Sequence, residues 1–508
     1  MLRNETTNDR SFIKTLSKSK LMAYCQCPKR LWLALNKAED ADDSKSQMAF
    51  AAGHAVGEVA QKVFDSSATG VNVDPNLIGW GQATAQTAQL MESGTRPVFE
   101  AVFRIKGALA LADIMLPMQN EGRSLWHMIE VKSSTELKGT HIDDIAVQTY
   151  LAKASGVQLG RVSLAHIDKE FVYAGDGDYN GLFKLVDLTD EVASRRDWVE
   201  DLMQRAQAVA QQEWSPIITM GRQCKDPYPC PFTAYCKLDS EDGASSLDVL
   251  PRVHWKRREK WAIEGIRELH DIPAEELSEM QEIVRQATMS GKVYTSGKKA
   301  RALLGEASLP AYFLDFETIN HAVPRHSGTR PYQQIPFQYS LHCLKGDGAL
   351  EHYEFLDTSG DDPRPELVKN LIMHAGKKGP IYVYNASMEQ TVLNQLSKAS
   401  PENSAELQSL SERIVDLLPV ARSCYYNPRQ EGSWSLKDLL PAMCPELGYS
   451  QLDDEVQDGT AAMKAYLEAI DRQTTADRRG ELRQRLLEYC KLDTLATVRL
   501  LEYLNKAQ

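Results

Sequence analysis

Residues 109–116 read LALADIML and residues 126–132 read WHMIEVK, and these two apolar stretches predict neighbouring β-strands. Asp113 lies inside the first stretch, and Glu130 and Lys132 end the second. Because alternate residues of a strand point to the same face, Glu130 and Lys132 can reach one site. Phosphodiester hydrolysis needs carboxylates that hold divalent cations, commonly with a lysine nearby. The pattern indicates such a site, although a Glu and a Lys on one strand can also form a simple ion pair.

The surrounding sequence predicts a helix, sheet, helix module. Amphipathic helices are expected after residue 17 and over 46–66, strands over 97–105 and 107–116, and another helix over HIDDIAVQTYLAKASG. This order resembles the PD-(D/E)xK nucleases of the RecB type. In that family a helical G-x-x-x-H-like segment precedes the acidic residues, and GHAVGEVA supplies His54. The helix after the lysine carries a Gln followed by an aromatic residue, and VQTY supplies Gln148 and Tyr150.

The resemblance implies a role for each of these residues. The implied ligands of Mg²⁺ or Mn²⁺ are His54, Asp113 and Glu130. Lys132 would position the attacking water, Gln148 would contact the substrate or hold the site together, and Tyr150 would belong to the substrate-binding surface. Ala112 precedes Asp113 where the family name has proline, a departure that many RecB-like members share.

Five of the nine cysteines fall in two N-terminal groups. The run CKDPYPCPFTAYC contains Cys224, Cys230 and Cys236, and CQCPKR contains Cys25 and Cys27. Three clustered thiols and a distant fourth can hold zinc or an iron–sulphur cluster. The spacing lacks the two short pairs that are usual for structural zinc, which favours iron and sulphur.

The cysteine arrangement resembles the iron–sulphur staple of RecB-like nucleases in CRISPR adaptation and in AddB-type repair subunits. There, one Cys that is typically followed by Pro joins three later cysteines around a [4Fe–4S] cluster. Because Cys27 precedes Pro28, the resemblance selects Cys27, with Cys25 as its alternative. The other four cysteines are expected to be buried small hydrophobic residues: Cys343, Cys424, Cys444 and Cys490.

A third constellation begins in YFLDFETIN, where Asp315 and Glu317 lie two apart on a predicted strand and face the same way. Two like charges on a buried strand are costly unless a cation offsets them. Further on, IYVYNASMEQTVL places one pair of polar residues four apart, and LLEYCKLDTLATVRLLEYL places another. These pairs are Asn385 with Glu389 and Tyr489 with Asp493.

This order resembles the DEDD exonucleases of the RNase H-like fold, whose motifs are D-x-E, N-x₃-D and Y-x₃-D. The resemblance implies that Asp315, Glu317, Glu389 and Asp493 bind two metal ions, that Tyr489 orients the attacking water, and that Asn385 contacts the substrate. Glu389 replaces the family's Asp, so Asp416 and Asp438 are alternatives for that position.

The expected fold class is α/β, with an α/β/α restriction-endonuclease-type core and an RNase H-like mixed sheet. The expected divisions are a disordered tail over 1–17, a RecB-like nuclease over 18–245, a helical connector over 246–305 and an exonuclease-like domain over 306–508. The combination resembles a bacterial family that fuses these two modules.

Charge and composition limit the function classes. The formal net charge of −12 excludes a generally basic nucleic-acid coat but allows local basic strips. The opening residues lack the apolar core of a signal peptide and no stretch is long enough to span a bilayer, so the protein is expected to be cytoplasmic. GKVYTSGKK departs from a phosphate-binding loop, so an ATPase is not expected and a separate helicase would open duplex substrates.

The expected function is a metal-dependent nuclease with two sites, acting on DNA rather than RNA, in repair or phage defence. The alternatives are a single-site nuclease, an RNA-processing exonuclease and a nucleic-acid-binding scaffold. The segment HWKRREKW at 254–261 either grips phosphates or is a solvated helix face.

Overall fold

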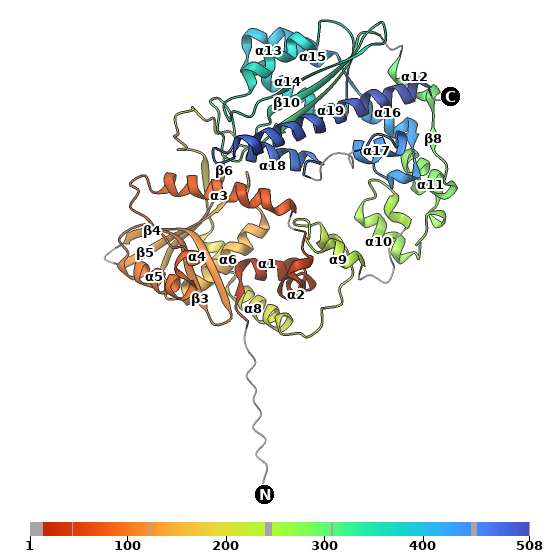
Figure 1. Ribbon diagram of the computed structural model, residues 1–508. Coiled ribbons are helices and arrows are strands. Elements are labelled where there is room, and N and C mark those ends of the chain that lie inside the picture. The colour runs from red at the N-terminus through yellow and green to blue at the C-terminus, as the bar shows by residue number, and fades with distance from the viewer. Residues whose placement is uncertain are drawn as a thin grey trace. The chain divides into compact units, whose positions relative to one another are not determined.

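The computed structural model describes residues 14–42, 44–120, 123–238, 246–305, 308–448 and 455–506 (Figure 1). The chain divides into two compact units. Unit 1 comprises Met1–Gly243 and His321–Tyr332, and unit 2 comprises Ala244–Asn320 and Gln333–Gln508. Helices and mixed sheets build both units, so the predicted α/β class is confirmed. No helix in the described ranges has both the length and the apolar character that a membrane crossing requires.

Unit 1 is built on a mixed sheet with the order β2-β3-β4-β5-β6-β7. Antiparallel pairing joins β3 to β4 and β4 to β5, whereas β5 and β6 run parallel with helix α6 between them in the sequence. Gly107, with φ of 88°, makes the turn between β3 and β4. The strands are β1 (Leu16–Ser17), β2 (Val71–Asn72), β3 (Val98–Ile105), β4 (Ala108–Asn120), β5 (Arg123–Lys132), β6 (Leu159–Ile167) and β7 (Phe183–Asp187).

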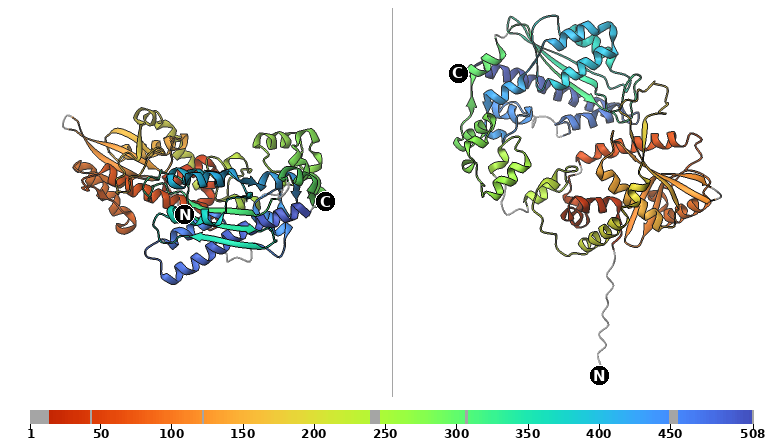
Figure 2. Two further views of the ribbon diagram at one scale, coloured as in Figure 1. Left: turned by 90° about the horizontal axis from the view of Figure 1, so that it is seen from above. Right: turned by 180° about the vertical axis from the view of Figure 1, so that it is seen from behind.

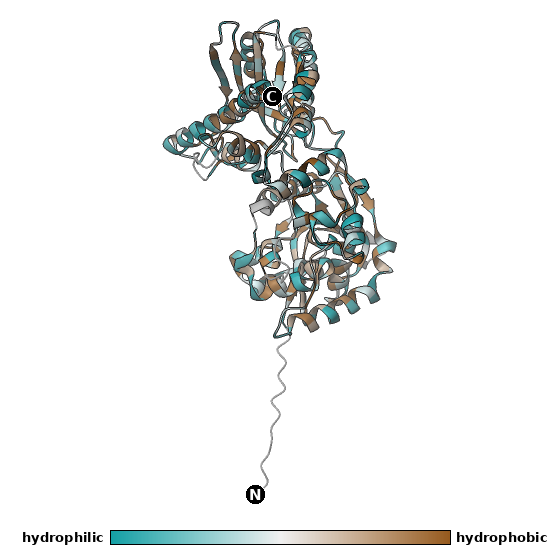
Figure 3. Ribbon diagram, turned by 90° about the vertical axis from the view of Figure 1, so that its right-hand side faces the viewer, coloured by the Kyte–Doolittle hydropathy of each residue, from teal (hydrophilic) through white to brown (hydrophobic). Residues whose placement is uncertain are grey.

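Helices cover both faces of this sheet: α6 packs on the side of Met115 and Met128, and Ala60 of α3 packs with Ile114 and Ile129 on the other side. Nine of the 16 residues of helix α6 are buried, and Ile145 and Leu151 pack with Trp126 of β5 in the largest apolar cluster of the unit. Figure 3 shows the hydrophobic colour concentrated along the strands, while the helices carry both colours. The helices are α1 (Lys18–Gln26), α2 (Pro28–Asn36), α3 (Ser44–Phe64), α4 (Pro75–Ile78), α5 (Trp80–Ser93), α6 (Gly139–Ala154), α7 (Thr189–Ala193), α8 (Arg196–Ala210) and α9 (Thr233–Leu238).

The predicted tail over 1–17 is too long at its C-terminal end. Leu16 is fully buried and pairs in parallel with Ala108 of β4, and Ser17 pairs with Leu109. Burial of the Leu16 side chain and two further backbone pairings favour order here over a loose chain. The first thirteen residues lie outside the described ranges.

A short segment that follows β9 in the sequence belongs to unit 1. The amide of Tyr173 donates to the carbonyl of Thr329 at 3.0 Å, and the amide of Gly328 donates back to Tyr173 at 2.8 Å. The Tyr332 hydroxyl donates to the carbonyl of Ser133, directly after Lys132. The segment thus supports the end of β5.

Unit 2 is built on a sheet with the order β11-β10-β9-β12-β13. The first three strands pair antiparallel, and β9, β12 and β13 run parallel. The strands of this sheet are β9 (Ala311–Ile319), β10 (Ile335–Leu344), β11 (Leu350–Leu356), β12 (Ile381–Val383) and β13 (Ile414–Asp416), and a separate pair is formed by β8 (Tyr294–Thr295) and β14 (Tyr425–Tyr426).

Helices cover both faces of the unit 2 sheet, and the views of Figure 2 show the long helix α19 running along it. The predicted connector over 246–305 belongs to this unit, because Trp261 and Val284 share an apolar cluster with Phe313 of β9. The helices are α10 (Trp255–Ile263), α11 (Glu279–Ser290), α12 (Gly297–Leu304), α13 (Arg364–His374), α14 (Ser387–Ala399), α15 (Ser404–Glu412), α16 (Leu417–Cys424), α17 (Leu436–Met443), α18 (Gly459–Ala469) and α19 (Ala476–Lys506).

Alternation along β9 decides which way its acidic residues point. Leu314 and Phe316 pack into the cluster formed with α13, α14 and α15. Phe313 packs on the opposite side with residues of α19. Because side chains alternate between the faces of a sheet, Asp315 and Glu317 face α19, as Phe313 does.

Candidate functional site

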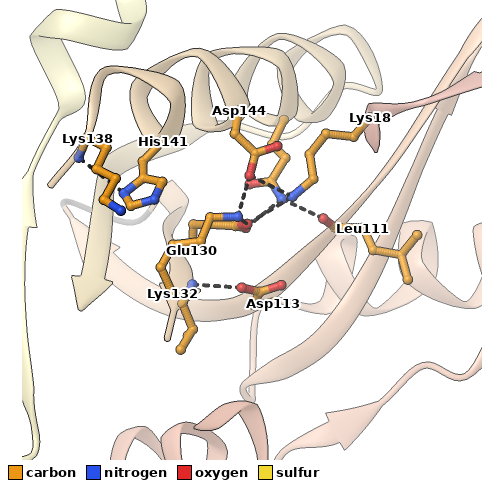
Figure 4. A network of polar contacts seen from close by, with 10 residues as sticks. Lys18, Leu111, Asp113, Glu130, Lys132, Lys138, His141 and Asp144 are labelled. Carbon is orange, nitrogen blue, oxygen red and sulfur yellow. Dashed lines mark hydrogen bonds and ion pairs between the residues drawn. The ribbon is translucent and has the colours of Figure 1, made fainter. Parts of the chain in front are cut away.

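Glu130 is the centre of the polar network in unit 1 (Figure 4). Its side chain is 2% exposed, and its Oε1 accepts from Lys132 Nζ at 2.7 Å and from Lys18 Nζ at 2.9 Å. Its Oε2 accepts from Gln148 Nε2 at 2.5 Å, and the same amide nitrogen donates to the Leu111 carbonyl at 2.8 Å. Since Gln148 is fully buried, it holds Glu130 against β4 and does not present its amide to a substrate.

Asp144 of α6 also belongs to this network, although the sequence analysis did not identify it. Its Oδ2 accepts from Lys18 Nζ at 3.1 Å and from Lys132 Nζ. Asp144 precedes Gln148 by four residues, so both side chains leave the same face of the helix. This four-residue spacing from Gln148 is the signal in the sequence that points to Asp144.

The pKa values of the two central carboxyl groups, Asp113 and Glu130, are shifted in opposite directions. Burial and the nearby charge of Glu130 raise the pKa of Asp113 well above its usual range, although its Oδ2 accepts from the Val131 amide at 2.7 Å. Burial would also raise the pKa of Glu130, but Lys132 and Lys18 outweigh it and hold this pKa below its usual range. Burial opposes the charge of Lys132, yet its acidic neighbours raise its pKa. A positive charge therefore persists beside the carboxylates.

Two further residues extend the network beyond the predicted set. Lys18 begins α1 and lies 112 residues before Glu130, and no local motif linked them. Glu100 lies in β3 with φ of 55°, between the paired residues Phe99 and Ala101. A positive φ is uncommon for a residue with a Cβ and marks local strain. Burial and Glu130 raise the pKa of Glu100, so its carboxyl group is within electrostatic range of the site.

The structure brings together most, but not all, of the predicted residues of unit 1. Asp113, Glu130 and Lys132 lie in one network with Gln148. His54 is exposed on α3, where its charge lowers the pKa of Glu100. Tyr150 is not brought to this network.

Tyr150 was predicted to contact the substrate, but it points away from the carboxylates. Two residues apart on a helix, Gln148 and Tyr150 leave on nearly opposite sides. Burial, together with Glu200 of α8, raises the pKa of Tyr150, and its ring packs against the apolar cluster of the sheet. Its position fits a packing role between α6 and α8.

The four predicted cluster cysteines lie close together in unit 1. Burial raises the pKa of Cys236, and Cys230, Cys224 and Cys27 each add to the rise. Burial likewise raises the pKa of Cys230, and both Cys224 and Cys27 contribute. Four thiols from the α1–α2 corner, the 224–230 loop and α9 are therefore within electrostatic range of one another.

Cys25 lies apart from this group. Burial and the nearby charge of Asp143 raise its pKa to about 12, so it faces α6. The corner that carries Cys27 is instead tied to the 224–230 loop, because Gln26 Nε2 donates to the carbonyls of Gln223 at 2.7 Å and Tyr228 at 2.8 Å. This geometry favours Cys27 over Cys25 as the fourth thiol.

A cleft of about 640 Å³ in unit 2 is lined by four of the six predicted exonuclease residues, whereas Glu317 and Glu389 are not among its lining residues. Asp315 comes from β9, Tyr489 and Asp493 come from α19, and Asn385 comes from the turn between β12 and α14; all four line the cleft. Asn385 has φ of 79°, so a residue with a strained backbone lies at the wall of the cleft. Three segments that are far apart in the sequence therefore meet here.

The carboxyl groups at this site repel one another. Burial and the charge of Asp493 raise the pKa of Asp315 well above its usual range, with further contributions from Glu317 and Glu389. Burial, Asp493 and Asp458 raise the pKa of Glu317 to about 8. Several buried acids with raised pKa values are typical of a site that receives a cation or performs acid–base chemistry.

Glu389 fits the second acidic position better than either alternative. It is 2% exposed, its Oε2 has no hydrogen-bond partner among the described residues, and burial raises its pKa to about 7. Asp416 accepts from the amides of Asn385 at 3.0 Å and Leu418 at 2.9 Å, so it fixes two turns. Asp438 is exposed and accepts from Ser435 at 2.6 Å.

Cys490 differs from the expected buried hydrophobic residue. It is buried, but its Sγ lies 3.6 Å from Asp315 Oδ2. Cys343 and Cys424 are buried as expected, whereas Cys444 is half-buried. The thiol of Cys490 thus belongs to the acidic site.

Two arginines line the same cleft as the acids. Arg252 is exposed and adopts φ of 55°, and Arg422 is half-buried. Burial lowers the pKa of Arg422, and the neighbouring charge of Arg252 lowers it further. Neither guanidinium has a hydrogen-bond or ion-pair partner within the described parts of the chain. Asp416 partly offsets the charge of Arg422, and the two adjacent cations still make this wall of the cleft attractive to anions.

The segment 254–261, by contrast, is occupied by intramolecular contacts. Arg258 pairs with Asp248 at 2.6 Å and Lys260 pairs with Glu276 at 2.5 Å. Trp261 is fully buried and donates to Glu276 at 2.6 Å. This basic and aromatic stretch therefore packs α10 onto unit 2.

Comparison with known proteins gives one partial family match. Residues 312–435 match a family described as a domain of unknown function (DUF2779), a range that includes Asp315, Glu317, Asn385 and Glu389. No curated protein matches the chain.

Proposed function

We propose that this protein is a metal-dependent nuclease with two hydrolytic sites, one in each unit. The observation that carries the proposal is the cleft of unit 2, which is lined by Asp315, Asp493 and Tyr489 and also by the two arginines Arg252 and Arg422. Carboxylates that gather a metal beside cations that attract phosphate form the composition expected for phosphodiester hydrolysis. The proposed substrate is a nucleic-acid strand, with DNA favoured over RNA.

The residues of unit 2 support a 3′–5′ exonuclease role of the DEDD type. Bound Mg²⁺ or Mn²⁺ would activate water and neutralise charge on the phosphate. Asp315, Glu317, Glu389 and Asp493 have the donor chemistry to hold such ions, because they are carboxylates whose mutual repulsion a cation would relieve. Tyr489 lines the cleft together with Asp315 and Asp493 and would orient the attacking water.

The residues of unit 1 support a second site of the RecB type. Asp113 and Glu130 provide carboxylates on neighbouring strands. The ammonium group of Lys132 forms ion pairs with Glu130 and Asp144. The ammonium group would position the nucleophile or stabilise charge on the phosphate. His54 lies near Glu100 and remains a proposed ligand.

The four converging cysteines support a [4Fe–4S] cluster that ties the ends of unit 1 together. Cys27 follows α1, whereas the other three lie about two hundred residues later. Four thiols near one another fit the ligand set of such a cluster, and zinc is the less favoured occupant. When bound, the cluster would cross-link the α1–α2 corner to the chain segment that ends unit 1.

The experiment that tests the unit 2 proposal uses 5′-labelled single-stranded DNA, duplex DNA and RNA under anaerobic conditions. With Mn²⁺ or Mg²⁺, we expect stepwise shortening that stops at phosphorothioate linkages placed at the 3′ end. EDTA and Asp315→Asn should abolish the shortening, whereas Asp347→Asn, which changes an exposed hairpin residue, should retain it. Shortening that persists in Asp315→Asn would contradict the assignment. Comparison of the shortening rates on DNA and on RNA would identify the substrate class.

A further inference from the structure

The acidic site of unit 2 contains a sulfur atom that the proposed exonuclease chemistry does not use. One carboxylate oxygen of Asp315, one of Glu317 and the Sγ of Cys490 all lie within 4.8 Å of one another. The Cys490 thiol is 3.6 Å from Asp315 Oδ2 and is fully buried. These three atoms form a group that one metal ion could contact.

A second observation points to a cation at the same place. Glu389 is 2% exposed, and its Oε2 has no hydrogen-bond partner among the described residues. Its charge is close enough to raise the pKa of Asp315. A buried carboxylate oxygen without a partner is costly, and a divalent cation would supply the missing interaction.

The geometry of α19 explains why the thiol faces this group. Cys490 precedes Asp493 by three residues, and side chains three apart lie on the same helix face. Cys490 therefore faces the carboxylates on β9 and not only apolar neighbours.

The type of donor affects which metal is favoured. Mg²⁺ takes oxygen ligands almost exclusively, whereas thiolates select softer ions such as Zn²⁺ and Co²⁺. We propose that Cys490 is a metal ligand in unit 2, and that the site of Asp315, Glu317 and Cys490 binds Zn²⁺ or Co²⁺ in preference to Mg²⁺. Binding replaces the thiol proton, which passes to solvent, with a metal–sulfur bond.

This inference rests on the proposed metal site of unit 2 and predicts a distinctive metal response. Zn²⁺ would occupy the site at concentrations at which Mg²⁺ does not. Mn²⁺, which accepts oxygen ligands but is softer than Mg²⁺, would be the better activating ion.

The test is a Co²⁺ titration of the full chain, followed by the thiolate-to-cobalt absorption band in the near ultraviolet and by Zn²⁺ competition. The wild type is compared with Cys490→Ser and Cys490→Ala, two replacements that keep or remove the polar atom. Cys343→Ser is the matched control, because it changes a buried thiol of β10 in the same unit. The thiols of unit 1 contribute equally to all four proteins, so only the difference spectrum is read.

We expect a difference band that both Cys490 variants lose and Cys343→Ser keeps, with Zn²⁺ affinity reduced at least about tenfold and Mg²⁺ affinity nearly unchanged. Equal Co²⁺ affinity and identical spectra in the wild type and both Cys490 variants would overturn the inference but leave the carboxylate site intact. If Asp315→Asn also failed to change divalent-cation binding, the proposed metal site of unit 2 would fall with it. Thermal unfolding of each variant identifies any loss of folding.

Discussion

Lys18 is the residue that most changes the interpretation of the unit 1 site. It shares both Glu130 and Asp144 with Lys132, so two ammonium groups face four carboxyl groups when Asp113 and Glu100 are included. One divalent cation is enough to balance the remaining charge. We therefore expect one tightly bound metal ion in this site. Lys18 would supply the positive charge that a second metal ion provides in two-metal sites.

Replacement of Lys18 by methionine should lower the activity of unit 1 at least about tenfold, because a charge beside the reacting phosphate is lost. Lys18→Arg should retain more activity, since it keeps the charge. Lys20→Met, on the same helix but bonded to the Ala34 carbonyl, is the control. Cleavage rates of a 3′-blocked substrate measure the effect, and equal rates for all variants would exclude Lys18 from the site.

Arg252 and Arg422 lead to a prediction about binding. Each Arg→Ala substitution should weaken binding of single-stranded DNA and reduce the dependence of log K on log salt by about 0.7, the value for one phosphate contact on a single strand. Arg472→Ala changes an exposed arginine that does not line the cleft and should leave the slope unchanged. Fluorescence anisotropy in Ca²⁺ at several salt concentrations gives the slopes. Wild-type slopes in both cleft variants would show that these arginines do not contact phosphate.

At the scale of elements, β9 and α19 carry the central acids of unit 2 on facing surfaces. Burial and Asp493 raise the pKa of Glu317 to about 8, above the value near 4.5 expected for an unfolded chain. Between these values the folded state binds more protons than the unfolded state, so stability falls as pH rises. Metal-free protein should therefore become less stable from about pH 5 to about pH 8.

Saturating Mn²⁺ should flatten this pH dependence, because the bound cation replaces the protons. Urea unfolding at each pH, with and without Mn²⁺, measures the free energy of unfolding. Glu317→Gln should reduce the slope without metal, and Asp315 and Glu389, whose pKa values are also raised, should maintain the rest. A slope that is the same with and without Mn²⁺ would show that the acids of β9 and α19 do not share a metal.

How far the sequence predicted these elements depends on whether the signal was local. Period-two alternation was enough to place Glu130 with Lys132 and Asp315 with Glu317. Asp144 carried a weaker local signal through its spacing from Gln148. Lys18 and Glu100 carried none, because their position depends on tertiary packing and on the irregular backbone of β3. Cys490 resembled a core residue, since the sequence does not show which neighbours a buried side chain faces.

At the scale of the whole molecule, the chain contains two compact units, and each gathers its own set of acids. The sequence predicts a division at residue 245, close to the boundary at Gly243, but it does not predict that His321–Tyr332 belongs to unit 1. That segment contacts unit 1 through backbone pairing with Tyr173 and through side chains such as Tyr332, and these long-range contacts leave no local pattern in the sequence. Each proposed site consists of residues of one unit only, so substitutions in one unit should remove one activity and leave the other.

The most direct measurement compares metal-dependent cleavage by the wild type, Lys132→Ala, Asp315→Ala and the double variant, using 3′-open and 3′-blocked DNA and RNA under anaerobic conditions. If the chain has two hydrolytic sites, Lys132→Ala will lose cleavage of the blocked substrate, Asp315→Ala will lose shortening from the open 3′ end, and the double variant will be inert. Wild type and variants that are equally inactive on every substrate would contradict hydrolysis at either site and leave a nucleic-acid-binding scaffold as the function.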